Sequence, residues 1–87
     1  MSRTLHSPRH KALTAFLAEK RKEAGMTQAT VAMRLGRHQS FVATVESGQR
    51  RIDVVELIDL AEAIGFDPTA AIAFLVGASQ RMASGRK

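Results

Sequence analysis

The chain has 87 residues, a formal net charge of +5 and no cysteine. This length suits one domain, and the lack of cysteine excludes a disulfide framework and a thiolate zinc site. No apolar run approaches the ~18 residues of a membrane span and the N-terminus lacks the apolar core of a signal peptide, so we expect a compact cytoplasmic protein without membrane association.

The first two predicted helices begin at capping residues and end at glycines. The first begins at Pro8, with Ser7 as its N-cap, and ends at Gly25. The second follows Thr27, spans about nine residues and ends at Gly36. Apolar residues at helical spacing should face the core in both: Leu13, Phe16 and Leu17, and then Val31, Ala32 and Leu35.

The third predicted helix spans residues 38–47 and ends at Gly48. Its apolar residues are Phe41, Val42 and Val45, which we assign to the core. The other positions carry polar or small side chains: Gln39, Ser40, Ala43, Thr44 and Glu46. The polar front end of this helix is therefore free to face either solvent or a polar partner.

Two further helices complete the predicted fold. Asp53 and Glu56 resemble a capping box at the start of the fourth helix, which ends at Gly65. Its expected inward stripe is Val54, Leu57, Ile58, Ala61 and Ile64. The fifth begins at Pro68 and is apolar nearly all round, so it must be covered.

We therefore predict an all-α, compact five-helix domain over residues 7–78. Residues 1–6 and the basic residues 79–87 should be flexible ends. The second and third helices, about residues 28–47, are joined by about three residues that include Gly36, an arrangement typical of a helix-turn-helix. In that motif the second helix enters the major groove of DNA.

Charge supports the same interpretation. Residues 1–45 carry eight lysines and arginines against two glutamates, whereas residues 46–67 carry two arginines against six acidic residues. A basic face opposite an acidic one is typical of nucleic-acid binders, although an anionic membrane surface or an ordinary soluble domain fits the same balance.

The segment MTQATVAMRLGRHQSFVATVESGQRRIDVVELIDLAEAIGFDP, about half of the chain, resembles the XRE-type helix-turn-helix proteins, which include the phage repressors and Cro. The shared features are T-Q at the start of the second helix, L-G at its end, Q-S before an apolar position, and E-x-G after the third helix. The phrase R-x-Q-S-F-V looks like a subset of small bacterial regulators. The resemblance implies a repressor-like, DNA-binding domain.

The resemblance also implies individual roles. Gln39, Ser40 and Thr44 occupy positions that read base edges, and a glutamine amide can bond adenine bidentately. His38, at the helix start, is a further base-contact candidate that is also within reach of a phosphate. Each could instead be an ordinary helix-surface residue, and Gln39 is the best candidate. Thr27 and Gln28 match phosphate contacts at a helix N-terminus, while the arginines that flank the reading helix are candidate phosphate clamps: Arg37, Arg50 and Arg51.

Two positions carry further implications. Glu46 matches a family position that pairs with an arginine of the first helix, here Arg21, and is therefore a structural residue. The subset more usually has a polar residue and a lysine where this chain has Ala43 and Thr44, so one basic contact on the reading helix is missing. Affinity or site preference should differ accordingly.

One small domain covers one half-site, so we expect a homodimer on a near-palindromic operator. The fifth helix supplies the expected interface, because its apolar residues exceed what one small core absorbs and relatives commonly pair there. These residues are Ala71, Ile72, Phe74, Leu75 and Val76. The alternative for this segment is that it only covers the core of one subunit.

The predicted function is sequence-specific binding of double-stranded DNA as a homodimeric transcriptional regulator, with repression as the expected mode and helix 38–47 in the major groove. The competing interpretation is a protein-interaction module, such as an antitoxin-like partner-binding protein with secondary DNA binding. An enzyme is not expected, because His6 and His10 lack a third metal ligand and there is no nucleophile motif or phosphate loop. Accordingly, no cofactor and no metal are predicted.

Overall fold

Five α-helices make up the part of the chain that the structure describes: α1 (Pro8–Glu23), α2 (Gln28–Leu35), α3 (Gln39–Glu46), α4 (Val54–Ile64) and α5 (Pro68–Ser84). This computed structural model describes the backbone of residues 7–84 and the side chains of residues 7–77. The predicted all-α, five-helix fold is confirmed. α5 continues through residues 79–84, which the sequence assigned to a polar tail, while residues 1–6 and 85–87 lie outside the described residues.

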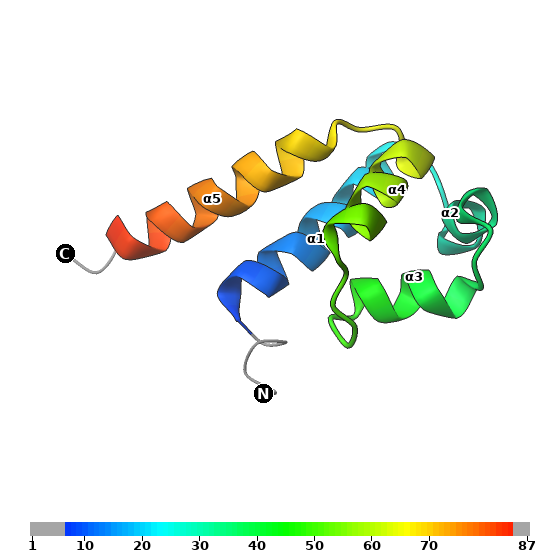
Figure 1. The fold of residues 1–87 in the computed structure, drawn as a ribbon, viewed down its shortest axis with the longest axis horizontal. Coiled ribbons are helices and arrows are strands. Elements are labelled where there is room, and N and C mark those ends of the chain that lie inside the picture. Colours follow the sequence, from blue (N-terminus) through cyan, green and yellow to red (C-terminus); the bar gives the residue numbers. More distant parts are fainter. Residues whose placement is uncertain (1–6, 85–87) are drawn as a thin grey trace.

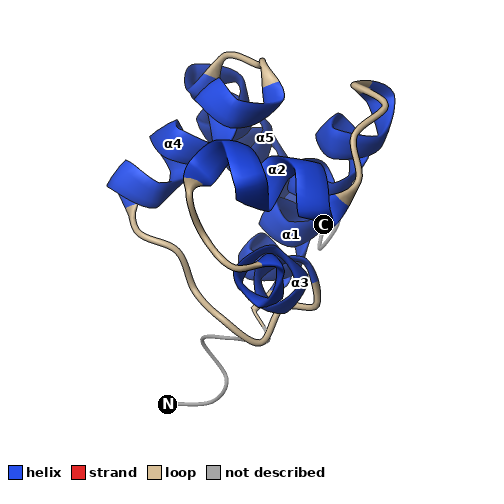
Figure 2. Ribbon diagram, turned by 90° about the vertical axis from the view of Figure 1, so that its right-hand side faces the viewer, coloured by secondary structure: helices blue, strands red, loops and turns tan. Residues whose placement is uncertain are grey.

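The helices are arranged so that α3 lies at one edge of the molecule. In Figure 1, α5 runs alongside α1 and extends away from α2, α3 and α4, which lie at the other end. Figure 2 shows α3 below α1 and α2, against which it packs. This placement leaves one side of α3 accessible.

Capping side chains define where the helices begin. The Ser7 and Thr27 hydroxyls accept the backbone N–H groups of His10 and Thr30 at 3.1 and 3.0 Å. These contacts satisfy N–H groups that otherwise have no partner at a helix start. The capping box of α4 is complete, because Asp53 Oδ1 accepts the N–H of Glu56 at 2.7 Å and Glu56 Oε1 accepts the N–H of Asp53 at 3.0 Å.

The core is built from apolar residues of all five helices. Its largest fully buried side chains are Leu17, Val31, Val42 and Val45. The inward stripe predicted for α4 is partly wrong: Val54 and Ile58 are 67% and 39% exposed, and Leu60 and Ala63 are buried in addition to Leu57, Ala61 and Ile64. Val54 is in the first turn of α4, beyond the edge of the core, and the buried stripe is rotated toward positions 57, 60, 61 and 64.

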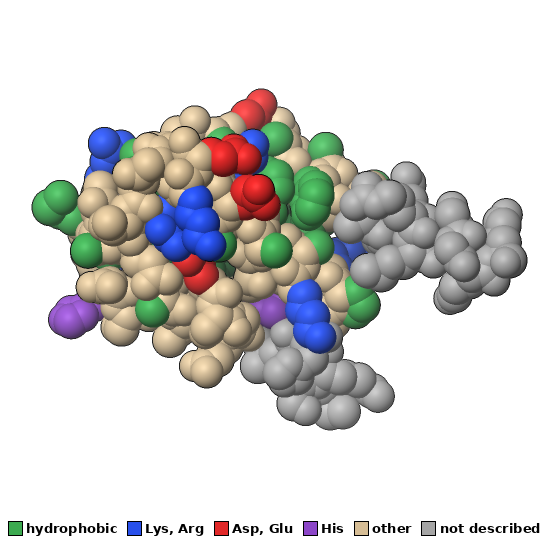
Figure 3. All heavy atoms as spheres, turned by 180° about the vertical axis from the view of Figure 1, so that it is seen from behind, with side chains coloured by type: hydrophobic (Ala, Val, Ile, Leu, Met, Phe, Trp, Pro, Cys, Tyr) green, Lys and Arg blue, Asp and Glu red, His purple; other side chains and the backbone are tan. Residues whose placement is uncertain are grey.

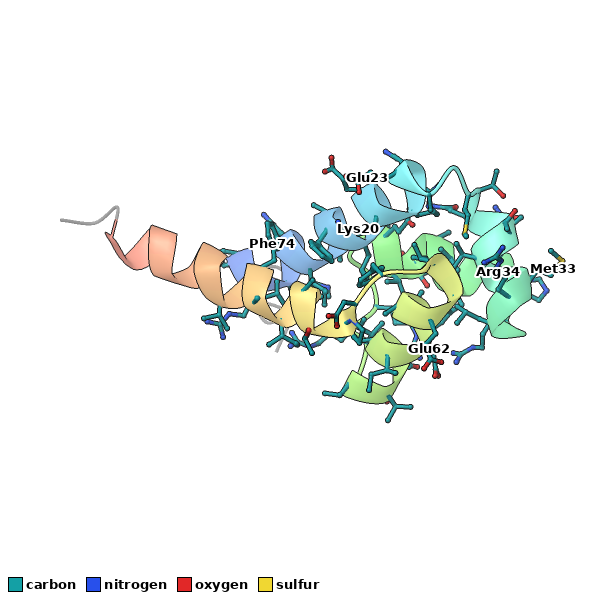
Figure 4. All side chains as sticks on the ribbon, turned by 90° about the horizontal axis from the view of Figure 1, so that it is seen from above. Lys20, Glu23, Met33, Arg34, Glu62 and Phe74 are labelled. Atoms are coloured by element: carbon teal, nitrogen blue, oxygen red, sulfur yellow. The ribbon has the colours of Figure 1, made fainter. Side chains whose placement is uncertain are left out.

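Aromatic rings attach α5 to α1. The Phe16 ring meets Phe66 edge-on, with ring centroids 5.6 Å apart, and lies 5.1 Å from the ring of Phe74. Figure 4 shows Phe74 on the side of α5 that faces α1. The first part of α5 is therefore held on the domain by packing.

Candidate nucleic-acid interface

The turn between α2 and α3 consists of residues 36–38, as predicted. Gly36 ends α2 with φ +69°, a left-handed conformation that glycine adopts without a steric penalty. The Arg37 N–H then donates to the carbonyl of Ala32 at 2.9 Å, which closes the end of α2. Ala32 and Val42 are both buried where α2 packs on α3, so the two helices form a compact helix-turn-helix.

α3 has one buried and one exposed side. Phe41, Val42 and Val45 are buried and anchor the helix in the core. Gln39 and Ser40, in the first turn, are exposed to solvent. A helix with this division is rigidly held while its N-terminal polar groups remain free to bind another molecule.

The other two predicted base-reading residues, His38 and Thr44, differ in whether their side-chain polar groups are available to a ligand. His38 is the exposed N-cap of α3, and its side chain makes no capping hydrogen bond within the described chain. Thr44 is half-buried, and its hydroxyl is close to the carbonyls of Ser40 and Phe41, at 2.9 and 3.0 Å. The Thr44 proton is therefore used inside the helix, which leaves its oxygen as an acceptor and its methyl group for contact.

Thr27 and Gln28, at the start of α2, both have structural contacts. Thr27 caps the helix, and its hydroxyl also lies 3.0 Å from that of Thr30. The Gln28 amide donates to Glu46 at 3.0 Å, which ties the start of α2 to the end of α3. An amide has a second N–H, so this contact does not exhaust its capacity to bind a phosphate.

The ion pair predicted between Arg21 and Glu46 is present. Arg21 Nε and Nη2 donate to the two carboxylate oxygens at 2.7 and 3.0 Å, and Arg21 Nη1 donates to the carbonyl of Met26 at 2.8 Å. The two side chains are only 12% and 11% exposed. Burial alone raises the pKa of Glu46, but the hydrogen bonds from Arg21 and Gln28 outweigh it, and the pKa lies below its usual range.

A second group of charges lies between α3 and α4, and we call it the Glu56 cluster: Arg37, Phe41, Arg50 and Glu56. Arg50 Nη2 donates to Glu56 Oε2 at 2.7 Å, and Arg37 Nη2 lies 3.8 Å from the same oxygen. The two guanidinium carbons lie 3.9 and 4.9 Å from the centroid of the Phe41 ring. The sequence predicted Glu56 only as a helix cap; its arginine partners are six and nineteen positions away, and no local pattern signals such contacts.

Charges of both signs adjoin one another across the surface. Figure 3 shows basic and acidic side chains next to each other near the middle of one face. Arg21 with Glu46, Arg50 with Glu56 and Lys20 with Glu23 are paired across or within helices. Basic and acidic side chains are therefore less separated on the surface than the division of charge along the sequence predicted.

Arg51, the third predicted phosphate clamp, is exposed just before the start of α4.

The predicted dimer residues divide into two groups. Ala71 is fully buried within the subunit and cannot contact a second copy, so its assignment to an interface is corrected. Ile72, Phe74 and Val76 are 47%, 38% and 48% exposed, while Leu75 is half-buried. α5 thus contributes to the core and also leaves apolar surface open.

Other kinds of site find little support in the described residues. Among residues 7–77, no three His, Asp or Glu side chains are grouped so that they could hold a metal ion; His10 is buried, and His6 lies outside the described residues. Within the same part of the chain, no single helix is long and apolar enough to cross a membrane. α4 and residues 68–77 of α5 reach that length and apolar character only together, as a pair bent by 117°.

Residues 12–74 match the family model of the helix-turn-helix domain. A solved XRE-family like protein from Pseudomonas syringae is 45% identical, with 87% of this chain and 93% of that chain covered and a TM-score of 0.79. The restriction-modification controller protein C.AhdI from Aeromonas hydrophila is 32% identical, with 71% and 94% covered and a TM-score of 0.67.

Among curated proteins, the chain is similar to an uncharacterized HTH-type transcriptional regulator, y4dJ, of Sinorhizobium fredii. The two are 40% identical over 48 residues, which is 55% of this chain. The match covers 62% of the length of y4dJ, so the chain spans less than two thirds of that relative.

Proposed function

The chain belongs to the XRE-type family of helix-turn-helix, DNA-binding transcriptional regulators, and we propose that it binds double-stranded DNA sequence-specifically as a homodimer. In this proposal α3 enters the major groove and α2 lies across the backbone. The protein acts as a repressor by occupying a near-palindromic operator, and it does so in the bacterial cytoplasm.

The observation that carries this proposal is the division of α3 into an anchored side and an exposed polar front. Gln39 is exposed in the first turn, where an amide that reaches the groove can accept from N6 and donate to N7 of adenine. Ser40 and His38 stand beside it and are equally exposed. Thr44, one turn further, offers an acceptor and a methyl group to the same groove.

Phosphate contacts frame these base contacts. Arg37 and Arg50 come from the two flanks of α3, and Arg51 follows them at the surface. Thr27 and Gln28 open α2, where the unpaired N–H groups and the helix dipole favour an anion. Such contacts set the register of the protein on DNA, whereas the groups on α3 read the sequence.

The exposed apolar residues of α5 support the homodimer. Ile72 and Val76 are separated by four positions and are each about half exposed, so they form one apolar strip along the helix. A second copy would cover this strip and place the two α3 helices ~34 Å apart, one turn of DNA.

Selection of bound fragments from randomised duplex DNA, at about 150 mM salt, tests the proposal. We expect an enriched motif with two inverted half-sites about ten base pairs apart, because a twofold dimer reads both. Binding that appears only at low salt and enriches no sequence would contradict sequence-specific regulation.

The same apolar strip favours one second candidate, a module that binds a different protein and DNA only secondarily. Sedimentation of the purified chain distinguishes the two. A stable dimer across the micromolar range supports the homodimer, because the strip is then covered by a second copy. A monomer that binds no operator until another protein is added would favour the partner-binding module.

A further inference from the structure

Two arginines from opposite flanks of α3 meet at one carboxylate. Arg37 precedes the helix and Arg50 follows it, and both approach Glu56 Oε2, at 3.8 and 2.7 Å. Phe41, a buried residue of α3, lies under both guanidinium groups. The cluster therefore joins the two ends of the α3 segment to the start of α4.

We propose that Glu56 is a positioning residue for DNA binding: it holds Arg37 and Arg50 together as one phosphate-binding pair beside α3. The inference rests on the proposed function and assigns to it a residue that does not itself contact DNA. An acidic side chain close to a DNA backbone would otherwise weaken binding by repulsion.

Glu56 is held too firmly to act as a removable block. Its Oε1 accepts the N–H of Asp53 at 3.0 Å, its own N–H donates to Asp53, and its side chain is 16% exposed. Moving the carboxylate away from the arginines would break the capping box of α4. The carboxylate is thus a fixed point on which the longer, more flexible arginine side chains are oriented.

The arginines keep donors for a ligand. Their side chains are 44% and 39% exposed, and a guanidinium group has five N–H donors. Arg50 directs one nitrogen to Glu56 and another to the carbonyl of Arg51 at 2.8 Å, while the Arg37 group lies over the Phe41 ring. Within the cluster the two guanidinium groups outweigh the one carboxylate by one positive charge, and a second carboxylate, that of Asp59, lines the same pocket as Arg37 and Glu56.

The sign of one substitution separates positioning from simple charge. Glu56→Gln removes a negative charge and keeps an oxygen that can accept the Asp53 N–H. If Glu56 only repels DNA, this change tightens binding; if it positions the arginines, binding weakens although the protein has become more positive. We expect an affinity loss of about tenfold for the selected duplex, the scale of a lost charge-assisted contact.

The matched control is Glu62→Gln, which removes the same charge from the same helix. Glu62 lines a groove with Arg34, contacts neither arginine of the Glu56 cluster as an ion pair, and has no ion pair among the described side chains. Figure 4 shows Glu62 and Arg34 near one another on α4 and α2. Its removal should leave affinity unchanged or slightly raised.

A double-mutant cycle tests whether Glu56 acts through the arginines. In a chain that already carries Arg37→Ala and Arg50→Ala, adding Glu56→Gln should no longer weaken binding. The variants with and without Glu56→Gln are compared at a lower salt concentration, at which both still bind the duplex. A general structural defect would weaken both backgrounds alike. The dependence of log K on log salt should also become shallower by about one per subunit in Glu56→Gln, as expected for one lost phosphate contact.

Arg50→Lys provides a second test that leaves the capping box intact. A lysine keeps the charge but lacks the fork that reaches Glu56 and a phosphate together, so its affinity should fall close to that of Arg50→Ala. The positioning role is overturned if Arg50→Lys binds like the wild type, or if folded Glu56→Gln binds as well as Glu62→Gln. A wild-type protein that does not distinguish the selected duplex from a scrambled one would instead refute the proposed function, and this inference with it.

Discussion

Arginine–glutamate contacts secure α3 at two places, and they differ mainly in exposure. At the C-terminal end of α3, Arg21 and Glu46 are 12% and 11% exposed. In the Glu56 cluster, the arginine side chains are 44% and 39% exposed around a carboxylate that is 16% exposed. The same pairing chemistry therefore serves the fold at one place and leaves groups for a ligand at the other.

The hydrogen bonds show the same contrast. Arg21 uses three nitrogens on Glu46 and the carbonyl of Met26, so little of its guanidinium group is free. In the Glu56 cluster, Arg50 donates two hydrogen bonds, whereas Arg37 has an ion-pair contact at 3.8 Å and lies over the Phe41 ring. Changes at Glu46 should therefore affect mainly stability, and changes at Glu56 mainly DNA binding.

The largest effect is expected for Glu46→Ala. It leaves Arg21 and Gln28 without their acceptor in a nearly buried position, and loss of one partner of such a pair costs about 3 kcal/mol. Urea denaturation followed by circular dichroism measures the change. Glu23→Ala is the control, because its pair with Lys20 is long and exposed and contributes less than about 1 kcal/mol. Equal losses in the two variants would contradict the buried role of Glu46.

Acid should destabilise the protein partly through Glu46. Its pKa is lower in the folded protein than its usual value, so its contribution to stability is present above the unfolded value, about 4.3, and is lost as the pH falls through the folded value. We expect the free energy of unfolding to fall more steeply between about pH 6 and pH 3 in the wild type than in Glu46→Gln. Parallel curves for the two proteins would show that Glu46 is not responsible.

A smaller effect on stability is expected for Glu56→Gln. The capping box keeps an acceptor, and the arginine pairs that it loses are partly exposed, so the free energy of unfolding should fall by less than about 1 kcal/mol. The same urea measurement checks this. A loss as large as that of Glu46→Ala would remove the contrast between the two sites.

Much of this fold follows from local signals in the sequence. Ser7, Thr27 and Asp53 predict the helix starts, and Gly36 and Gly65 the ends, because caps and left-handed glycines act through neighbours in the chain. The Arg21–Glu46 pair followed from family resemblance, since its partners are 25 positions apart.

What the sequence could not predict depends on how the helices pack. Val54 and Ile58 continue the apolar spacing of α4, but the core does not reach them. Ala71 belongs to an apolar segment in which periodicity cannot separate the core side from a partner side. Arg50 and Arg51 are adjacent residues of the same type, so the sequence alone does not show which of them pairs with Glu56. The position of α4 brings Arg50 to that carboxylate.

The measurement that tests the central claim most directly is a comparison of the wild type and Gln39→Ala on the selected duplex and on a scrambled duplex at about 150 mM salt. If the exposed front of α3 reads bases, Gln39→Ala should lower affinity for the selected duplex about tenfold and leave the scrambled duplex unchanged. An equal change on both duplexes, or none on either, would contradict sequence reading by α3.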